Sequence, residues 1–362
     1  MAPVAALADR VTDPAALPHA VEIQRNVPVY DGQATPTPKM MAEWVRVLLP
    51  GGPGALVLRG AVADLDALNR ATEIFEAIIA EEGSGAGDHF AEAGSNARIW
   101  DSLGKLCAAD PEVFARYHAI PTMDALCRAW LGPGYQMTAQ VNLVYPGGAA
   151  QTAHRDYHLG FMTQDQAAQY PAHIHAMCGQ LTLQGGIAHC DMPIDSGPTK
   201  LLPYSQALPD GYLSYHRAEV AAFFEAHCVQ LPLAKGDAIF FNPALFHGAG
   251  ENRTNDVHRL ANLFQVSSPF GRAMEAVDRD GMARRLYPVI AAGVVTGDKA
   301  RAAVAAAVEG YAFPTVMDTD PPQGGLAPDN PAALFWRCQE AGLAAQAFEQ
   351  ELDAMNARKG GA

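Results

Sequence analysis

The 362-residue sequence lacks long apolar runs and closely paired cysteines. No stretch approaches the roughly 18 consecutive apolar residues of a membrane-spanning helix, so no such helix is expected. Residues 1–18 contain only a short apolar run with no basic segment before it, which argues against a signal peptide. The six cysteines form no CxxC pair, which indicates reduced thiols and favours a cytoplasmic location.

Positive charge is also scarce. The chain has 25 Lys and Arg against 39 Asp and Glu, a formal net charge of -14. Because an acidic surface repels phosphate backbones, nucleic acid is not expected as a partner, and anionic membrane surfaces are disfavoured. Apolar residues make up 49% and charged residues 18%, which is typical of a globular protein that is long enough to bury a large core.

The expected elements divide the chain into three parts. Residues 1–37, rich in Pro and Ala, are interpreted as an extended arm. Residues 38–270 form the main domain, helical at first and β-rich from about residue 135. Residues 271–362 predict a helical extension packed on the core. Helices are expected at 39–49, 64–83, 111–131 (interrupted at Pro121), 274–291, 298–311 and 331–357, a short strand at 55–58, and a loop at 84–95.

The middle of the chain predicts the fold class. Apolar and polar residues alternate over 136–145, with Gln140 and Asn142 on one face, as in a half-buried strand. Short strands separated by Gly, Pro and Asn turns predict an antiparallel barrel or a double-sheet jelly roll. The fold class is therefore a mainly β core with helical additions. Further strands are expected at 177–184, 229–233, 237–241 and 259–267.

Three residues in this part have the chemistry of a metal site. His154 and Asp156 stand two residues apart, so in extended backbone both point to the same side. His247, which follows an apolar strand, is the natural third ligand. Two imidazoles and one carboxylate with open coordination positions are the arrangement of non-haem Fe(II) oxygenases. Arg259 follows on the next strand, and its guanidinium group can form a bidentate pair with a dicarboxylate cosubstrate.

These motifs together resemble the phytanoyl-CoA dioxygenase family of Fe(II)- and 2-oxoglutarate-dependent oxygenases. The resemblance covers about residues 85–270 and rests on the segments YPGGAAQTAHRDY, DMPIDSGPTKLLPYS and KGDAIFFNPALFHGAGENRT, in that order. It implies a double-stranded β-helix, or jelly-roll, core. It also implies that His154, Asp156 and His247 bind Fe(II), that Arg259 binds the distal carboxylate of 2-oxoglutarate, and that O2 is consumed.

The resemblance suggests further contacts. Asn142 is expected to contact 2-oxoglutarate, with Gln140 on the same face as the alternate. By position alone, four residues are candidates for substrate contact: Gln151, Tyr157, His158 and Lys200. Ordinary surface or packing roles are an open alternative for these residues. Family members often have a hydroxyl residue two positions after the distal histidine, where this chain has Ala249, and Thr254 is an alternative source of that hydroxyl group.

Two other pairs of residues, each containing histidine, are alternative candidates for metal binding. His189 and Asp191 also form a His-x-Asp pair, although a hydrogen-bonded polar pair at a strand end is the favoured interpretation. His173 and His175 could bind a second metal from a strand, or form a polar stripe beside the pocket.

The implied function is that of a dioxygenase that hydroxylates an unactivated C–H bond of a small molecule and releases succinate and CO2. Related iron halogenases have a small residue in place of Asp156, so the carboxylate favours hydroxylation, or another oxidation such as desaturation, over halogenation. Two alternatives are a non-catalytic metal- or ligand-binding jelly roll and a protein-directed hydroxylase on the same core. The long C-terminal helix leaves a homodimer open.

Overall fold

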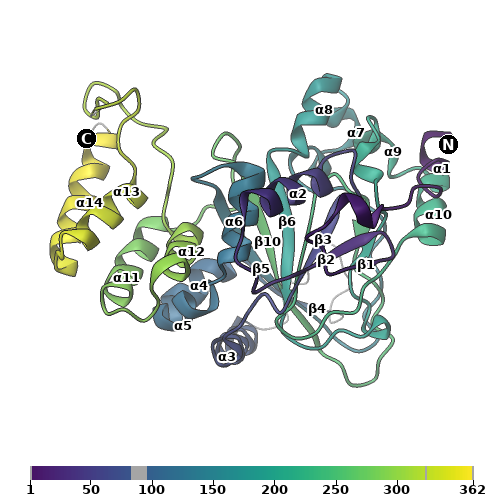
Figure 1. The fold of residues 1–362 in the computed structure, drawn as a ribbon, viewed down its shortest axis with the longest axis horizontal. Helices are drawn as coiled ribbons and strands as arrows, with labels where there is room; N and C mark the ends of the chain where they lie inside the picture. Colours follow the sequence, from purple (N-terminus) through teal and green to yellow (C-terminus); the bar gives the residue numbers. More distant parts are fainter. Residues whose placement is uncertain (1, 83–95, 323, 361–362) are drawn as a thin grey trace.

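An eight-stranded sheet forms the centre of the molecule (Figure 1). The computed structural model describes residues 2–82, 96–322 and 324–360, so the expected loop at 84–95 lies outside the described residues. The strands of this sheet run in the order β1-β2-β3-β8-β6-β10-β5-β4. Their bounds are β1 Glu22–Gln24, β2 Val27–Asp31, β3 Ala55–Arg59, β4 Asn96–Ile99, β5 Gln136–Val144, β6 Thr182–Ala188, β8 Ala238–Phe241 and β10 Arg259–Ser267.

A second, smaller layer completes a jelly roll. Strands β7 (Lys200–Leu201) and β9 (His247–Gly248) pair antiparallel. Single bridges extend this pair on both sides, because His154 pairs with His247 and Leu201 pairs with Val229. The chain alternates between this layer and the antiparallel group β8-β6-β10-β5 of the main sheet, which is the connectivity of a jelly roll. The predicted fold class, a jelly-roll core with helical additions, is confirmed.

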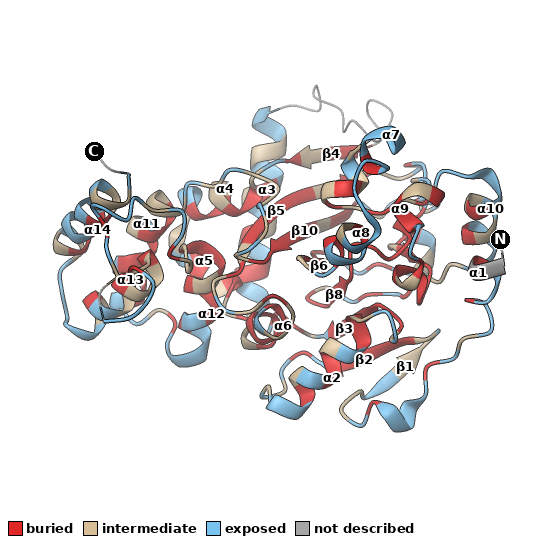
Figure 2. Cartoon of the chain, turned by 90° about the horizontal axis from the view of Figure 1, so that it is seen from above, coloured by how far each residue is buried: buried red, intermediate tan, exposed pale blue. Residues whose placement is uncertain are grey.

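Apolar side chains fill the space between the two layers at one end. Ile239 and Phe241 of the main sheet are buried in one cluster with Leu201 and Leu245 of the smaller layer. The central strands are buried almost along their whole length (Figure 2). This packing holds the two layers apart by the thickness of their side chains, which leaves room for a cavity where the side chains are small.

The expected strand positions are confirmed for β5, β8 and β10, but the structure differs from two other expectations. The segment predicted as a strand at 177–184 begins as the end of helix α8 (Ala172–Cys178), and β6 starts only at Thr182. Pro171 stands at the N-cap position of α8, with φ -72° and ψ 159°, and favours the helix start. The expected strand at 229–233 contributes only isolated bridges.

The N-terminal arm is part of the sheet. Strands β1 and β2 form an antiparallel hairpin, and β2 pairs parallel with β3, which confirms the strand expected at 55–58. Val27, Val29 and Tyr30 are almost fully buried. Hence the segment expected as an extended arm widens the main sheet at its edge.

Helices cover the sheet and extend from it. Thr37 caps α2 by accepting a hydrogen bond from Met40 N, and Asn330 caps α13 in the same way from Ala333 N. The helix expected at 331–357 is two helices, separated by a turn at Gly342, whose φ is 65°. The helices with at least seven residues are α2 Pro38–Leu48, α3 Leu65–Glu82, α4 Ser102–Ala109, α5 Pro111–Tyr117, α6 Pro121–Leu131, α8, α10 Ala218–His227, α11 Arg279–Ala291, α12 Gly297–Ala307, α13 Pro331–Glu340 and α14 Ala345–Gly360.

The C-terminal helices lie at the end of the molecule opposite to α10 (Figure 1). Helices α11 and α12 pack on α4, α5 and α6, and α13 and α14 pack on α11. None of the helices in the described part of the chain has the length and apolar character needed to cross a membrane.

Candidate metal centre

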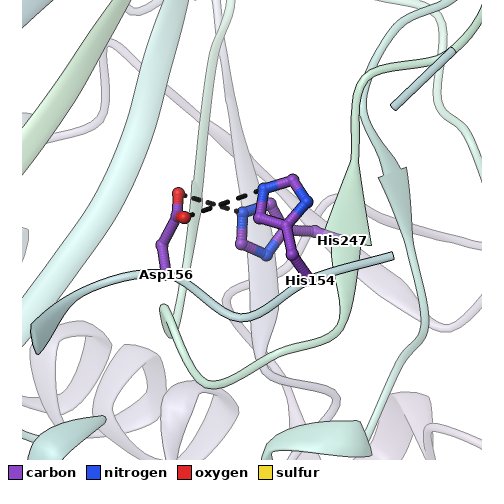
Figure 3. A group of neighbouring side chains, drawn as sticks. All are labelled: His154, Asp156 and His247. Carbon is purple, nitrogen blue, oxygen red and sulfur yellow. Dashed lines mark hydrogen bonds and ion pairs between the residues drawn. The ribbon is translucent and has the colours of Figure 1, made fainter. Parts of the chain in front are cut away.

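His154, Asp156 and His247 converge in the structure (Figure 3). Nε2 of His154 lies 3.7 Å from Oδ1 of Asp156, and Nε2 of His247 lies 3.4 Å from Oδ2 of the same carboxylate. One ligand atom from each residue lies within 4.8 Å of the other two. The expected three-residue group is thus brought together, with two imidazoles and one carboxylate as donors.

The backbone places the two histidines side by side. His154 N donates to His247 O at 2.9 Å, and His247 N donates to His154 O at 3.1 Å. Two residues further on, Asp156 N donates to Pro243 O at 3.1 Å. The three donors therefore stand on two paired extended segments rather than on free loops, which fixes their relative positions before any metal binds.

Second hydrogen bonds orient both rings. Nδ1 of His154 lies 2.9 Å from Thr152 O, and Nδ1 of His247 lies 2.8 Å from Leu245 O. A carbonyl oxygen can only accept, so each Nδ1 carries the proton and each Nε2 presents its lone pair to the carboxylate side. This is the tautomer that a metal-binding histidine needs.

The electrostatics of the group suit a cation. Burial acts to raise the pKa of Asp156, but the imidazoles of His154 and His247 and a hydrogen bond from Gln184 outweigh it, so this pKa lies below its ordinary value. Burial and the neighbouring His247 lower the pKa of His154. A carboxylate beside two imidazoles whose Nε2 atoms face it is a donor set that suits a metal ion.

Both competing histidine pairs have other roles. His189 is 2% exposed; its Nδ1 lies 2.8 Å from Thr72 Oγ1 and its Nε2 lies 2.8 Å from Tyr117 Oη. Both of its nitrogens are therefore engaged, and the interpretation as a hydrogen-bonded polar residue applies. His173 and His175 lie on helix α8 rather than on a strand, and His175 Nε2 lies 2.9 Å from Ala167 O.

The metal group opens onto a cavity between the two layers. The cavity has a volume of about 140 Å³. Part of its floor consists of small residues that pair across β6 and β10, among them Ala188 and Ala261. A Cβ atom added to Gly186 in this floor would lie 3.1 Å from Leu263 Cδ2. A larger residue at position 186 would therefore occupy space that the glycine leaves for a ligand.

Arg259 lines the same cavity and has no acidic partner in the part of the chain that the structure describes. It is 6% exposed, and its Nη1 donates to the backbone oxygens of Ser196 (2.8 Å) and Gly250 (3.0 Å). Burial lowers its pKa to about 10, and no carboxylate of the described residues forms an ion pair with it. A buried cation without a counter-charge is costly, so the cavity is suited to a ligand that carries an anionic group.

The cavity contains one candidate for the missing hydroxyl contact. Ala249 lines the cavity and has no hydroxyl group. Thr254 does not line it, and its Oγ1 donates to Asn252 Oδ1 at 2.6 Å. Among the described lining residues, Thr199 is the one with a hydroxyl group.

The amide residues expected in the pocket are present there. Asn142 and Gln140 line the cavity from β5, and Gln151 lines it from the segment before His154. Gln140 Nε2 donates to Glu275 Oε2 at 3.1 Å, and Gln151 Oε1 accepts from Ala249 N at 3.1 Å.

Three residues expected to contact the substrate do not line this cavity. Tyr157 has a φ of 69° and is 1% exposed, and its hydroxyl group donates to Arg272 O at 2.7 Å. His158, with a φ of 50°, packs its ring edge-on against Tyr157 outside the cavity lining. Lys200 is 7% exposed and donates to Glu225 Oε1 at 2.7 Å. The positive φ angles turn the chain directly after Asp156, which moves the side chains of Tyr157 and His158 away from the cavity.

Other lining residues were missed from the sequence. They are Arg98, Trp100, Phe161, Gln184, Gln265 and Met274. One signal was available for Gln265, because it lies six positions after Arg259 on a predicted strand and therefore points to the same face. The others come from segments whose approach to the cavity depends on the tertiary fold.

Comparisons with known proteins agree with the motifs. A family model described as phytanoyl-CoA dioxygenase (PhyH) matches residues 52–261, which is more than half of the chain. A curated protein named dioxygenase trt7, from Aspergillus terreus, is 32% identical over 154 residues, which cover 42% of this chain and 48% of that protein. The chain thus matches about half the length of this relative.

Solved structures show a weaker likeness. The non-heme alpha-ketoglutarate-dependent epimerase SnoN from nogalamycin biosynthesis is 19% identical, with a TM-score of 0.45, over 64% of this chain and 84% of that one. The carbocyclase SnoK from the same biosynthesis is 17% identical, with a TM-score of 0.47, over 62% and 83% of the two chains. The jelly-roll assignment rests on the strand pairing described above.

Proposed function

The chain belongs to the phytanoyl-CoA dioxygenase family, and from this premise we propose that it is an Fe(II)- and 2-oxoglutarate-dependent dioxygenase acting on a small molecule. The observation that supports this most strongly is the combination of two groups in one cavity. The His154, Asp156 and His247 donors match iron, and the buried, unpaired Arg259 matches an anionic cosubstrate.

We assign the following roles to the residues of the chain. His154, Asp156 and His247 hold the iron through Nε2, a carboxylate oxygen and Nε2. Arg259 binds the distal carboxylate of 2-oxoglutarate with the part of its guanidinium group that does not donate to Ser196 and Gly250. Thr199 supplies the hydroxyl contact that Ala249 cannot, and Asn142 contacts the cosubstrate from β5. The small residues of the floor leave room for 2-oxoglutarate.

The bound iron and 2-oxoglutarate would supply the oxidising chemistry, in which O2 is consumed and succinate and CO2 are released. The protein orients the substrate and excludes water from the cavity. We propose hydroxylation of a C–H bond as the outcome. The Asp156 carboxylate occupies the position that a halide would need, which disfavours halogenation.

The test is turnover of 2-oxoglutarate by the purified protein. Succinate formation should depend on added Fe(II) and on O2, and a panel of small molecules should be screened for stimulation of it. If the protein neither binds iron nor forms succinate with any member of the panel, the enzyme function is excluded and a non-catalytic binding protein takes its place.

A further inference from the structure

We propose that Gln184 and Gln265 form a neutral polar subsite next to the metal centre that binds a hydrogen-bond donor, a hydroxyl or an amide N–H, on an otherwise apolar substrate. This inference rests on the proposed function, because it names the class of substrate that the same cavity accepts.

The two glutamines face each other across neighbouring strands. Gln184 on β6 and Gln265 on β10 are direct partners in the antiparallel register, so their side chains leave the sheet on the same face. Both line the cavity, and they are 9% and 5% exposed. On β10, the face that carries Gln265 also carries Arg259, six residues away at the other end of the strand. The cavity floor thus has a cationic end and a neutral amide end.

A contact with the metal centre fixes the orientation of Gln184. Its Nε2 donates to Asp156 Oδ2 at 2.5 Å. Because the amide nitrogen of Gln184 makes this contact, its Oε1 points elsewhere. Oε1 of Gln184 is buried and has no hydrogen-bond partner among the described residues.

Gln265 has the same unmet requirement. Its Oε1 is also buried without a partner in the described structure. A buried carbonyl oxygen that lacks a donor destabilises the folded protein, and a ligand that donates to both oxygens would remove this penalty. Both atoms are acceptors, and the matching ligand group is therefore a donor.

The surroundings of the two glutamines define the remainder of the ligand. Leu263 lies two residues before Gln265 on the same face, and Met274 lies 3.5 Å from Gln140 Nε2 through its sulfur atom. Phe161 and Trp100 line the same cavity and remain 48% and 37% exposed. Partly exposed aromatic and aliphatic side chains around a small polar centre suit an apolar skeleton that carries one or a few donor groups.

The contact between Gln184 and Asp156 also limits where oxidation occurs. The oxygen and nitrogen atoms of an amide group are only about 2.2 Å apart, given its bond lengths. A donor held by Gln184 Oε1 therefore lies within about 8 Å of the carboxylate that would bind iron, since a hydrogen bond adds about 2.9 Å. The oxidised carbon should accordingly be one close to the donor group of the substrate.

The subsite can be tested with matched probes that differ only in donor capacity. Secondary alcohols and their ketones on decalin, norbornane and adamantane skeletons test the hydroxyl donor, and lactams with their N-methyl derivatives test the amide donor. Binding is measured anaerobically to the protein loaded with Fe(II) and 2-oxoglutarate, by equilibrium dialysis. We expect at least one donor series to bind about tenfold more tightly than its matched non-donors, as one net hydrogen bond predicts.

Variants locate the effect. Gln265→Met should remove the preference for donors, and Gln265→Glu, which keeps an acceptor, should retain it. Gln180→Met, at an exposed glutamine whose amide only bonds Ala176 O, is the matched control and should behave as wild type. Equal binding of donors and non-donors, absence of binding by every probe, or an unchanged preference in Gln265→Met would overturn the proposal.

A separate measurement distinguishes this failure from failure of the proposed function. Fe(II) and 2-oxoglutarate should give a visible metal-to-ligand absorption band before any probe is added. A protein without that band contradicts the proposed function, whereas a protein with the band but without donor preference contradicts only the subsite.

Discussion

His154 and His247 exchange both of their backbone hydrogen bonds, at 2.9 and 3.1 Å, so the two imidazoles are presented by one bridged pair of extended segments. Their ring centroids lie 4.5 Å apart. Because side-chain hydrogen bonds to Thr152 O and Leu245 O also fix the rings, the donors are arranged by the chain itself.

Removal of one imidazole should therefore abolish metal binding but leave the protein folded. In the absence of metal, the free energy of unfolding of His154→Ala should lie within about 1 kcal/mol of the wild-type value, because the backbone bridge does not need the side chain. Fe(II) at about 100 times its dissociation constant should stabilise wild type by about 2.7 kcal/mol and should leave the variant unchanged. Anaerobic thermal unfolding measures this, with His227→Ala at an exposed histidine as the control. A metal-induced rise in the variant would contradict the assignment.

Replacement of Arg259 should weaken 2-oxoglutarate binding specifically. Lysine keeps the charge but cannot form the bidentate pair, so Arg259→Lys should raise the dissociation constant for 2-oxoglutarate by about 10- to 100-fold with iron binding retained. The control is Arg253→Lys, at a half-exposed arginine paired with Asp195 on the surface. Equal 2-oxoglutarate affinity in Arg259→Lys and wild type would show that the guanidinium group does not bind the cosubstrate.

Thr199 should matter more than Thr254 for the cosubstrate. Thr199→Val removes the hydroxyl group that lines the cavity and keeps the shape of the side chain, so 2-oxoglutarate affinity should fall about 3- to 10-fold. Thr254→Val breaks the bond to Asn252 and should change stability without this loss of affinity. The assignment fails if the two variants bind 2-oxoglutarate in the reverse order.

Stability should fall in acid because of two buried histidines. Burial lowers the pKa of both His118 and His189 from 6.5 to about 3. Between these values the unfolded chain binds a proton at each position and the folded chain does not, so the free energy of unfolding decreases as pH falls from 6.5 towards 3. Each histidine contributes about 1.4 kcal/mol per pH unit in the middle of this range.

His118 allows a direct measurement of this effect, because neither of its ring nitrogens has a hydrogen-bond partner among the described residues. His118→Met should reduce the loss of stability between pH 6 and pH 5 by about 1.4 kcal/mol, as measured by urea unfolding at both pH values. An unchanged pH slope would mean that His118 is protonated in the folded protein.

Local patterns predicted the parts of the site that depend on strand geometry. The 259–267 strand was predicted with its observed bounds, as one of the short strands separated by Gly, Pro and Asn turns. The metal residues could be proposed because a His-x-Asp pair and a later histidine define a coordination chemistry without knowledge of the fold.

The sequence predictions failed where tertiary contacts determine which side chains reach the cavity. Tyr157 follows Asp156 directly and was expected in the cavity, but its positive φ and its bond to Arg272 O direct it into the core. Gln184 was missed because its importance depends on the register between β6 and β10 and on a contact with Asp156, 28 positions away. Neither the register nor the contact can be predicted from the neighbouring residues in the sequence.

The central claim is that His154 and not His189 provides the first imidazole of an iron centre that binds 2-oxoglutarate. An anaerobic titration with Fe(II) and 2-oxoglutarate, followed through the visible metal-to-ligand band, tests it in wild type, His154→Ala and His189→Ala. The structure predicts the band in wild type and in His189→Ala, and its loss in His154→Ala. A band that persists in His154→Ala and disappears in His189→Ala would contradict the metal assignment.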